Sequence, residues 1–334
     1  MAIMNKITYK QIAQQLNISQ ATVTMVMNNR PGVSENTRQR VLAAALEAGY
    51  KPKSKNVDTV GSVALLIGDM EARGLVDNPY FSVICDTMHQ TAISRHFTFS
   101  IKYVSRVEDI DDPSIDGYIL LASVMSQDRI ITFTKTKHPI VVLDNSKAFD
   151  YADTVVIDNE NGIKKVMEHL ISLGHRRVGY IQSDPALHNF TERFEAYKRH
   201  MNRCQYPISA DDIINVGIDL QRIQLQVYEA CKVKTSFPTA FIADNDFIAL
   251  AAQSALRELG IVVGKDVALV GFDDIPFSKI ADVPLTTVKT FNDELGKVSV
   301  ERLIELIEKP SPPRKYTIST KLVIRDSTIK YAAN

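Results

Sequence analysis

Residues 7–50, ITYKQIAQQLNISQATVTMVMNNRPGVSENTRQRVLAAALEAGY, decide how this chain begins to fold, and they predict three short helices. Thr8 and Gln11 stand in the T-x-x-Q spacing of a capping box, ahead of apolar positions that repeat with a helical period. Asn17 suits the turn that ends this first helix. Ser19 offers an N-cap oxygen to a second helix.

The second predicted helix, which runs to about Met27, has two unlike faces. Val23, Val26 and Met27 follow the i, i+3, i+4 spacing of a buried stripe. The other face is polar or short where a solvated helix would usually carry Glu and Lys. It comprises Gln20, Ala21, Thr22, Thr24, Met25 and Asn28. Such a face suits contact with another macromolecule.

A third helix completes the predicted head. Pro31-Gly32 breaks the chain, and Ser34 caps a helix that we expect to end at Gly49. Two helices joined by a tight turn and braced by a third form a helix-turn-helix, which places its second helix in the DNA major groove. The alternative is a small structural subdomain of a larger enzyme.

The distribution of charge favours DNA binding over that alternative. Residues 1–57 hold eight Lys and Arg against two acidic residues, which gives +6. The whole chain has 39 of each sign, so residues 58–334 hold 31 basic against 37 acidic side chains, or −6. A neutral total therefore hides a basic head on an acidic body, and a cationic head is attracted to phosphate.

Length and composition predict a soluble, multidomain protein. A chain of 334 residues with 45% hydrophobic side chains is expected to form two or three domains with ample cores. Its cysteines, Cys85, Cys204 and Cys231, are few and far apart, which fits unpaired thiols in a reducing cytosol. We expect a cytoplasmic location without a membrane partner, since neither a signal core nor an apolar run of about 20 residues is present.

After a basic polar linker at 51–61, apolar strands alternate with helical patterns. Strands are expected at 62–67, 97–104, 118–121, 140–143, 155–157, 177–181, 239–243 and 267–270. Helices are expected at 80–95, 161–173, 191–201, 220–231 and 247–259. This alternation predicts parallel sheets covered on both faces. The pattern runs twice, so two similar α/β halves with a cleft between them are expected.

The head carries the run T-x-x-x-I-A-x-x-x-x-I-S-x-A-T-V-T-x-V-x-N-x-x-x-x-V-S-x-x-T-R-x-x-V-x-x-A-x-x-x-x-G-Y-x-P over about 45 positions. In this order it resembles the lactose-repressor/galactose-repressor family of bacterial transcription regulators. The body resembles the same family, and through it periplasmic sugar-binding proteins. Segments that carry this likeness include NPYF at 78–81, IDGYILL at 115–121, PIVVLDN at 139–145, ADND at 243–246 and LVGFDD at 269–274.

The resemblance implies an α/β fold class: an N-terminal three-helix helix-turn-helix head plus a two-lobed body, like a periplasmic binding protein, with parallel sheets. We expect the head at 1–50, the linker at 51–61, an N-terminal lobe at 62–157 plus about 288–320, and a C-terminal lobe at 158–287 plus about 321–334.

At the DNA face, the resemblance assigns base contacts to Gln20, Ala21 and Met25. Gln pairs bidentately with adenine and Ala meets a thymine methyl, but Met cannot replace the basic residue that the family usually has there to contact guanine. Phosphate contacts are implied for Thr8, Thr22, Thr24, Asn28, Ser34 and Thr37. Helix capping is the alternative role for Thr8 and Ser34, and the two roles are compatible.

The linker departs from the family. Relatives carry a hinge of the type A-R-x-L that folds on DNA and inserts a leucine into the minor groove, whereas residues 51–61 contain no Ala-Arg pair and no Leu. We therefore expect Lys51, Lys53 and Lys55 to hold phosphate electrostatically, with only a small bend in the DNA.

In the cleft, the resemblance assigns effector contacts to Arg193, Asn245 and Asp273, and more weakly to Asp69, Tyr80 and Phe81. Phe272 is either a ligand platform or core. An Arg fork, carboxylate acceptors and an aromatic face suit a polyol. Structural alternatives remain open: Arg193 paired with a surface acid, Asp273 as a helix cap, and Asp158 and Asn159 as structural residues at a lobe crossover.

The sequence favours a regulator over an enzyme. It has no H-x-x-x-H pair, G-x-S-x-G elbow or P-loop, and we expect no catalytic residue, metal or cofactor. The predicted function is a homodimeric, sequence-specific regulator that binds double-stranded operator DNA under the control of a sugar-like effector. We expect it to act as a repressor. A purine-dependent or other corepressor-dependent regulator is the second interpretation, and an effector-free DNA-binding module is the third.

Overall fold

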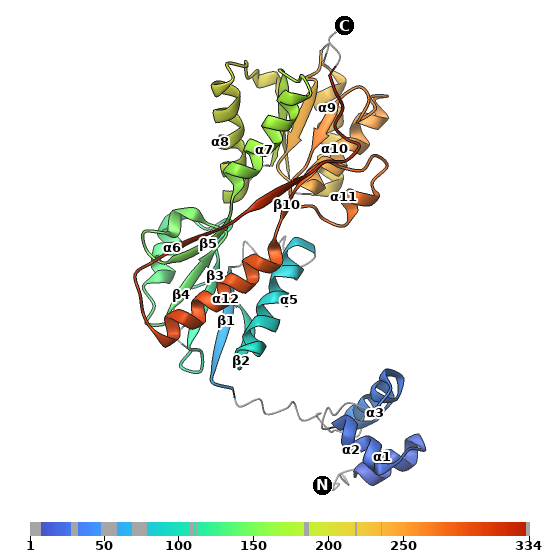
Figure 1. Cartoon of the computed structure of the whole chain (residues 1–334), viewed down its shortest axis with the longest axis vertical. Helices are drawn as coiled ribbons and strands as arrows, with labels where there is room; N and C mark the ends of the chain where they lie inside the picture. The colour runs from blue at the N-terminus through green and yellow to red at the C-terminus, as the bar shows by residue number, and fades with distance from the viewer. Residues whose placement is uncertain are drawn as a thin grey trace. The chain divides into compact units, whose positions relative to one another are not determined.

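The computed structural model describes residues 8–27, 33–47, 59–68, 79–106, 110, 112–183, 187–217, 219–234 and 236–331 (Figure 1). These residues belong to two compact units, a head within Met1–Val60 and a body over Gly61–Asn334. Most of the predicted linker, residues 51–58, lies outside the described residues.

The head contains the three helices that the sequence predicts: α1 (Tyr9–Leu16), α2 (Gln20–Met27) and α3 (Glu35–Glu47). Both halves of the capping box between Thr8 and Gln11 are present. Asn17 ends α1 in the left-handed conformation, with φ at 53°. The helices share one small core: Ile12, Ala13, Val23, Val26, Met27, Val41, Ala44 and Ala45. The predicted end of α3 at Gly49 lies outside the described residues.

The N-terminal lobe of the body is built on one parallel sheet, in the order β11-β5-β4-β3-β1-β2. Its strands are β1 (Gly61–Gly68), β2 (Phe97–Val104), β3 (Gly117–Leu121), β4 (Ile140–Leu143), β5 (Asp153–Ile157) and β11 (Lys315–Ile318). Its helices are α5 (Pro79–Ser94), α6 (Gln127–Thr134), the short η2 (Ser146–Ala148) and α12 (Asn292–Glu308). Helices α5 and α12 pack side by side against the sheet (Figure 1).

The C-terminal lobe repeats this design around a parallel sheet in the order β7-β6-β8-β9. Its strands are β6 (Val178–Ser183), β7 (Ile213–Val216), β8 (Ala240–Ala243) and β9 (Ala268–Val270). Its helices are α7 (Asn159–Ser172), α8 (His188–Arg203), η3 (Ala210–Asp212), α9 (Leu220–Lys232), α10 (Asp246–Glu258) and α11 (Phe277–Ile280). The α/β class with parallel sheets is therefore confirmed.

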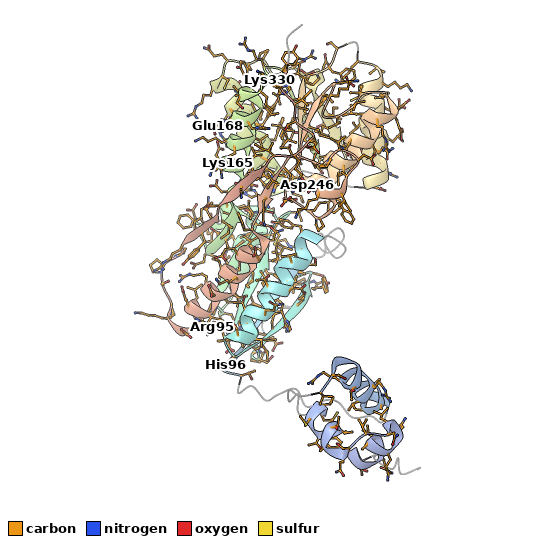
Figure 2. All side chains as sticks on the ribbon, turned by 45° about the vertical axis from the view of Figure 1, so that its right-hand side comes forward. Arg95, His96, Lys165, Glu168, Asp246 and Lys330 are labelled. Atoms are coloured by element: carbon orange, nitrogen blue, oxygen red, sulfur yellow. The ribbon has the colours of Figure 1, made fainter. Side chains whose placement is uncertain are left out.

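The chain passes between the lobes after β5, after β10 (Thr287–Thr290) and after β11. Strand β10 pairs antiparallel with β12 (Thr320–Val323), and this ribbon runs across the boundary between the lobes (Figure 1). Asp246, labelled in Figure 2, lies at the end of the C-terminal lobe that faces the N-terminal lobe, whereas Lys330 lies at the far end. The carboxyl ends of the β-strands in both lobes therefore point to one region.

Candidate functional site

The head presents the α2 face that the sequence assigned to DNA bases. Gln20 and Ala21 are exposed and Met25 is half-buried, while Val23 and Val26 are buried against α1 and α3. The split between an inner and an outer face of α2 is as predicted. An exposed Gln and Ala beside Met offer one bidentate amide and two apolar contacts to a groove.

The hydroxyl groups assigned to phosphate are held by local hydrogen bonds. Ser19 Oγ accepts from the backbone N–H of Thr22 at 3.0 Å and contacts the Thr22 hydroxyl at 2.8 Å. Thr24 Oγ1 donates to the Gln20 carbonyl at 2.9 Å. Thr8 caps α1, and Ser34 accepts from the backbone N–H of Thr37 at 3.3 Å. These bonds fix the orientation of each hydroxyl, while Asn28 lies outside the described residues.

In the body, Arg193 on α8 is the centre of a buried polar cluster. The side chain is 2% exposed, and each of its nitrogens has a protein acceptor. Nε donates to Asn159 Oδ1 at 2.9 Å, Nη1 to the Asp244 carbonyl at 2.6 Å, and Nη2 to Asp273 Oδ1 at 3.3 Å. The guanidinium carbon lies 3.7 Å from the centre of the Phe272 ring. Arg193 is thus fixed in both position and plane.

The N-terminal lobe contributes Tyr80 and Asp144 to the same cluster. Tyr80 begins α5, and its hydroxyl donates to Asp144 Oδ2 at 3.4 Å. Asp144 follows β4 and also accepts from Asn189 on α8 of the other lobe. Burial and then the charge of Asp144 raise the pKa of Tyr80 well above its usual value, so this phenol stays a donor.

Burial dominates the electrostatics of the carboxylates. It raises the pKa of Asp244 to about 7, against hydrogen bonds from Ser183 and Tyr180 that favour the charged form. It raises the pKa of Asp273 to about 6, despite the opposing charge of Arg193. The pKa of Asp144 is raised for the same reason. The negative charge on Asp144 also raises the pKa of Asp273, so the ionisation of a residue in one lobe depends on a residue in the other.

Two cluster residues have unusual backbone conformations. Asp144 has φ at 62° and Asp273 has φ at 112°, in the region that favours glycine. Each follows a buried β-strand at its carboxyl end, where the chain must turn sharply to present a carboxylate. A strained backbone conformation of this kind persists only where the surrounding packing and hydrogen bonds fix it, and such residues are common at ligand sites.

Beside the cluster, hydrogen bonds join the lobes directly. The backbone N–H of His188 donates to the Ser123 carbonyl at 2.9 Å. Ser146 Oγ lies 3.0 Å from His188 Nε2 and donates to Glu192 Oε1 at 2.5 Å. Burial alone would raise the pKa of Glu192, but bonds from His188, Ser146 and Asn159 lower it to about 2. We call Ser146, His188 and Glu192 the interlobe latch.

The structure brings three of the sequence-predicted effector residues together: Arg193, Asp273 and Tyr80. Asn245 adjoins them, but its Oδ1 caps α10 by accepting from Ile248 at 3.0 Å. Phe81 packs in the lobe core. Phe272 is fully buried beneath Arg193, so its ring supports the arginine. Asp69 lies outside the described residues.

Sequence reasoning did not assign Asp144, Asn189 or Asp244 to this site. It also took Asn159 for a crossover residue only, although the Asn159 side chain orients Arg193. Arg193 pairs with a buried acid rather than a surface one, and Asp273 is not the cap of α11, whose N-cap residue is Pro276. Polar residues directly after buried strands were the available signal for Asp144 and Asp244.

Comparisons with known proteins define the class of the chain. The family model of bacterial regulatory proteins of the lacI family matches residues 2–53, and that of the periplasmic binding protein-like domain matches residues 167–328. A transcriptional repressor named PurR from Actinobacillus pleuropneumoniae is 27% identical over 335 residues, covering 96% of this chain and 98% of its own.

Solved structures share the fold. A lac repressor dimer bound to operator and the anti-inducer ONPF has a TM-score of 0.72 at 24% identity, covering 97% of this chain and 100% of its own. The transcriptional regulator CelR in complex with cellobiose has a TM-score of 0.72 at 23% identity, covering 96% and 100%.

A helix-turn-helix head joined to a two-lobed binding body defines a DNA-binding transcription regulator. The head is that of the lacI family of bacterial regulatory proteins, and the relatives that match nearly the whole chain are transcription regulators of this kind. Within the described residues, no helix is both long and apolar enough to span a membrane, and no group of three or more His, Cys, Asp or Glu side chains is placed to hold a metal ion.

Proposed function

We propose that this regulator is a homodimeric repressor whose affinity for operator DNA is controlled by a small, sugar-like effector bound in the cleft between the two lobes. The observation that carries the effector role is the buried cluster around Arg193. Its groups come from both lobes, so a ligand that binds there couples their relative position to occupancy.

The proposed base contacts are Gln20, Ala21 and Met25, and they rest on the outer face of α2. The proposed phosphate contacts are Thr8, Thr22, Thr24, Asn28, Ser34 and Thr37. The basic charge of residues 1–57 supports this assignment. When Lys and Arg neutralise phosphates, counterions leave the DNA, and their release supplies much of the affinity of a basic head for DNA. The lac repressor structure described above holds operator DNA, which agrees with this role.

Support for a dimer comes from exposed apolar side chains. Val83 and Ile93 on α5 are 43% and 47% exposed, and Phe277 and Ile280 on α11 are 51% and 78% exposed. Each pair lies on one helix of one lobe, and a helix that exposes large apolar side chains fits an interface with a second copy. A two-fold dimer would present two heads to the half-sites of an operator.

A direct experiment tests both halves of the proposal. The full chain is used to select duplexes from a random pool at low ionic strength, and affinity for the selected duplex is measured with and without candidate effectors by fluorescence anisotropy. We expect an enriched palindrome and an effector that changes affinity by about tenfold or more. Failure to enrich any duplex would refute the regulator role in this form.

A variant separates the two sites. Arg193→Lys cannot reproduce three directed bonds and a stacked plane, so it should lose the effector response while the head still binds the selected duplex. Arg257→Lys, an exposed arginine that pairs with Asp282, is the matched control and should respond normally. An unchanged response in Arg193→Lys would place the effector elsewhere.

A purine corepressor is the second candidate, because the PurR repressor matches the chain over nearly its full length. Purine bases should then raise the melting temperature, and increase DNA affinity, in the screen where sugars have no effect. A ligand at 100 times its dissociation constant adds about 2.7 kcal/mol to the free energy of unfolding, which such a screen detects readily.

A further inference from the structure

Among the described residues, two buried oxygens of this region have no hydrogen-bond partner. Asp144 is 2% exposed; Tyr80 donates to its Oδ2 and Asn189 also favours its charged form, whereas no described residue makes a hydrogen bond to its Oδ1. The hydroxyl of Ser183, 3% exposed at the end of β6, is likewise unpaired. A buried carboxylate oxygen without a donor is costly, which favours a ligand that donates a hydrogen bond to it.

The nitrogen-bearing side chains of the cluster already bond to protein groups. Arg193 directs all three of its donor nitrogens to Asn159, Asp244 and Asp273, and its face lies against Phe272. His188 lies 3.3 Å from Glu192 and contacts Ser146. The charge of Arg193 is already shared with Asp273 at 3.3 Å, so an anionic ligand would have to compete with that carboxylate for it.

The carboxylates of the cluster come from both lobes. Asp144 stands on the N-terminal lobe, and Asp244 and Asp273 stand on the C-terminal lobe. The charges of Asp144 and Asp273 act on each other, and those of Asp273 and Asp244 do so as well. A phosphate or carboxylate group between them would add a like charge where burial leaves charges poorly screened by water, and it accepts hydrogen bonds without donating any.

We propose that the cleft admits uncharged or cationic polyols and excludes phosphorylated and carboxylated sugars, with Asp144 setting this choice. The inference rests on the effector role proposed above. A ligand hydroxyl or ammonium supplies the donor that Asp144 Oδ1 lacks. An anionic group in the same place leaves that oxygen unpaired and faces three carboxylates.

The test is a thermal-shift and calorimetric panel on the full chain at neutral pH. The probes are glucose, galactose, mannose and cellobiose, with the 6-phosphate, the uronate and the 2-amino form of each hexose. We expect a neutral or amino sugar to bind, and its phosphate and uronate to bind at least about tenfold more weakly. An anionic member that binds more tightly than its neutral parent would overturn the inference while leaving the effector role standing.

A second measurement assigns the choice to one residue. Asp144→Asn keeps the shape of the side chain and removes its charge, so the ratio of neutral to anionic affinity should fall by about tenfold. Asp116→Asn is the control, because exposed Asp116 lies at the opposite end of β3 and accepts from Ser62. Its ratio should match that of the parent chain.

Remaining outcomes are also decisive. An unchanged ratio in Asp144→Asn would remove Asp144 from the inference and overturn it. A panel in which no sugar of any charge raises the melting temperature would overturn the sugar-effector role, and this inference with it. A ratio that falls equally in both variants would show a general charge effect and would likewise contradict the role of Asp144.

Discussion

Asp244 shows, for a single residue, how burial in the cluster makes a charged carboxylate unfavourable. Its carboxylate accepts from the Tyr180 hydroxyl at 2.8 Å and from the Ser183 backbone N–H at 2.6 Å. Burial nevertheless raises its pKa from 3.8 to about 7. The unfolded chain therefore ionises Asp244 at a lower pH than the folded chain does, and this residue's contribution to stability falls as the pH rises from about 4 to about 7.

Asp244→Asn should remove that dependence. Its free energy of unfolding relative to the parent chain should rise across the same pH window, by up to about 4 kcal/mol. Urea unfolding at a series of pH values measures it. Glu192→Gln is the contrast: the pKa of Glu192 is lowered to about 2, so the parent chain gains stability from Glu192 above about pH 4.5 and loses it as the pH falls. Parallel curves for Asp244→Asn and the parent would contradict the prediction.

Single residues were predicted unevenly from the sequence. Arg193 and Asp273 could be assigned because each stands in a short motif that resembles the family. The position of Asp144 after a buried strand was a signal, but its pairing with Asn189 could not be predicted, because β4 and α8 lie far apart in the chain and meet only in the folded body. A pattern read along the sequence carries no information on which distant polar groups share one buried space.

At the scale of elements, α7 positions the arginine through one small residue. A Cβ added to Gly162 would lie 2.7 Å from Cζ of Phe272, the ring beneath Arg193. Gly162→Ala should therefore displace Phe272, lower the free energy of unfolding by about 1–3 kcal/mol and weaken the effector response. Thermal unfolding and calorimetry measure these effects.

Gly217→Ala provides the matched control for that change. Its added Cβ would lie 3.7 Å from Gln226 Oε1, at an ordinary contact distance. We expect its stability to change by less than about 1 kcal/mol, with a normal effector response. Equal losses in the two variants would show that the close approach at Gly162 has no special role.

The linker carries a second prediction at this scale. Residues 51–61 hold Lys51, Lys53 and Lys55 but no leucine, so the wedge that opens a minor groove is missing from this segment. We expect the operator to bend only slightly. Circular-permutation gel mobility on a selected duplex measures the angle, and a sharp central kink would refute the prediction.

Element boundaries were predicted best where local chemistry decides them. The capping box of α1 and its left-handed stop at Asn17 are readable from short spacing. Helix α8 begins at His188, three residues before the predicted start at 191, and that first turn carries Asn189 and part of the latch. Its N-cap, Leu187, makes no side-chain capping bond, so the usual sequence signal for a helix start is absent there.

For the body as a whole, the latch joins the two lobes beside the buried cluster. Removing the Ser146 hydroxyl deletes its bonds to His188 and Glu192. Ser146→Ala should increase the opening of the lobes, and the backbone amide of His188 reports it because that amide donates across the boundary to Ser123. We expect its hydrogen exchange to quicken by about tenfold.

Ser172→Ala is the control for the latch. The Ser172 hydroxyl donates to the His169 carbonyl within α7, so its loss breaks a bond inside one lobe. Exchange at His188 should then remain at the parent rate. Equal rates in Ser146→Ala and the parent chain would show that the latch does not hold the lobes closed.

The strand order of the N-terminal lobe has a consequence for synthesis. Strand β11, at Lys315–Ile318, closes the edge of a sheet whose other strands all lie before residue 158. On the ribosome, the amide edge of β5 must therefore wait without a neighbour until almost the entire polypeptide has been made. The DNA-reading head, whose contacts are local, has no such delay. A newborn chain is thus able to fold its operator-binding module well before it has any means of responding to a metabolite.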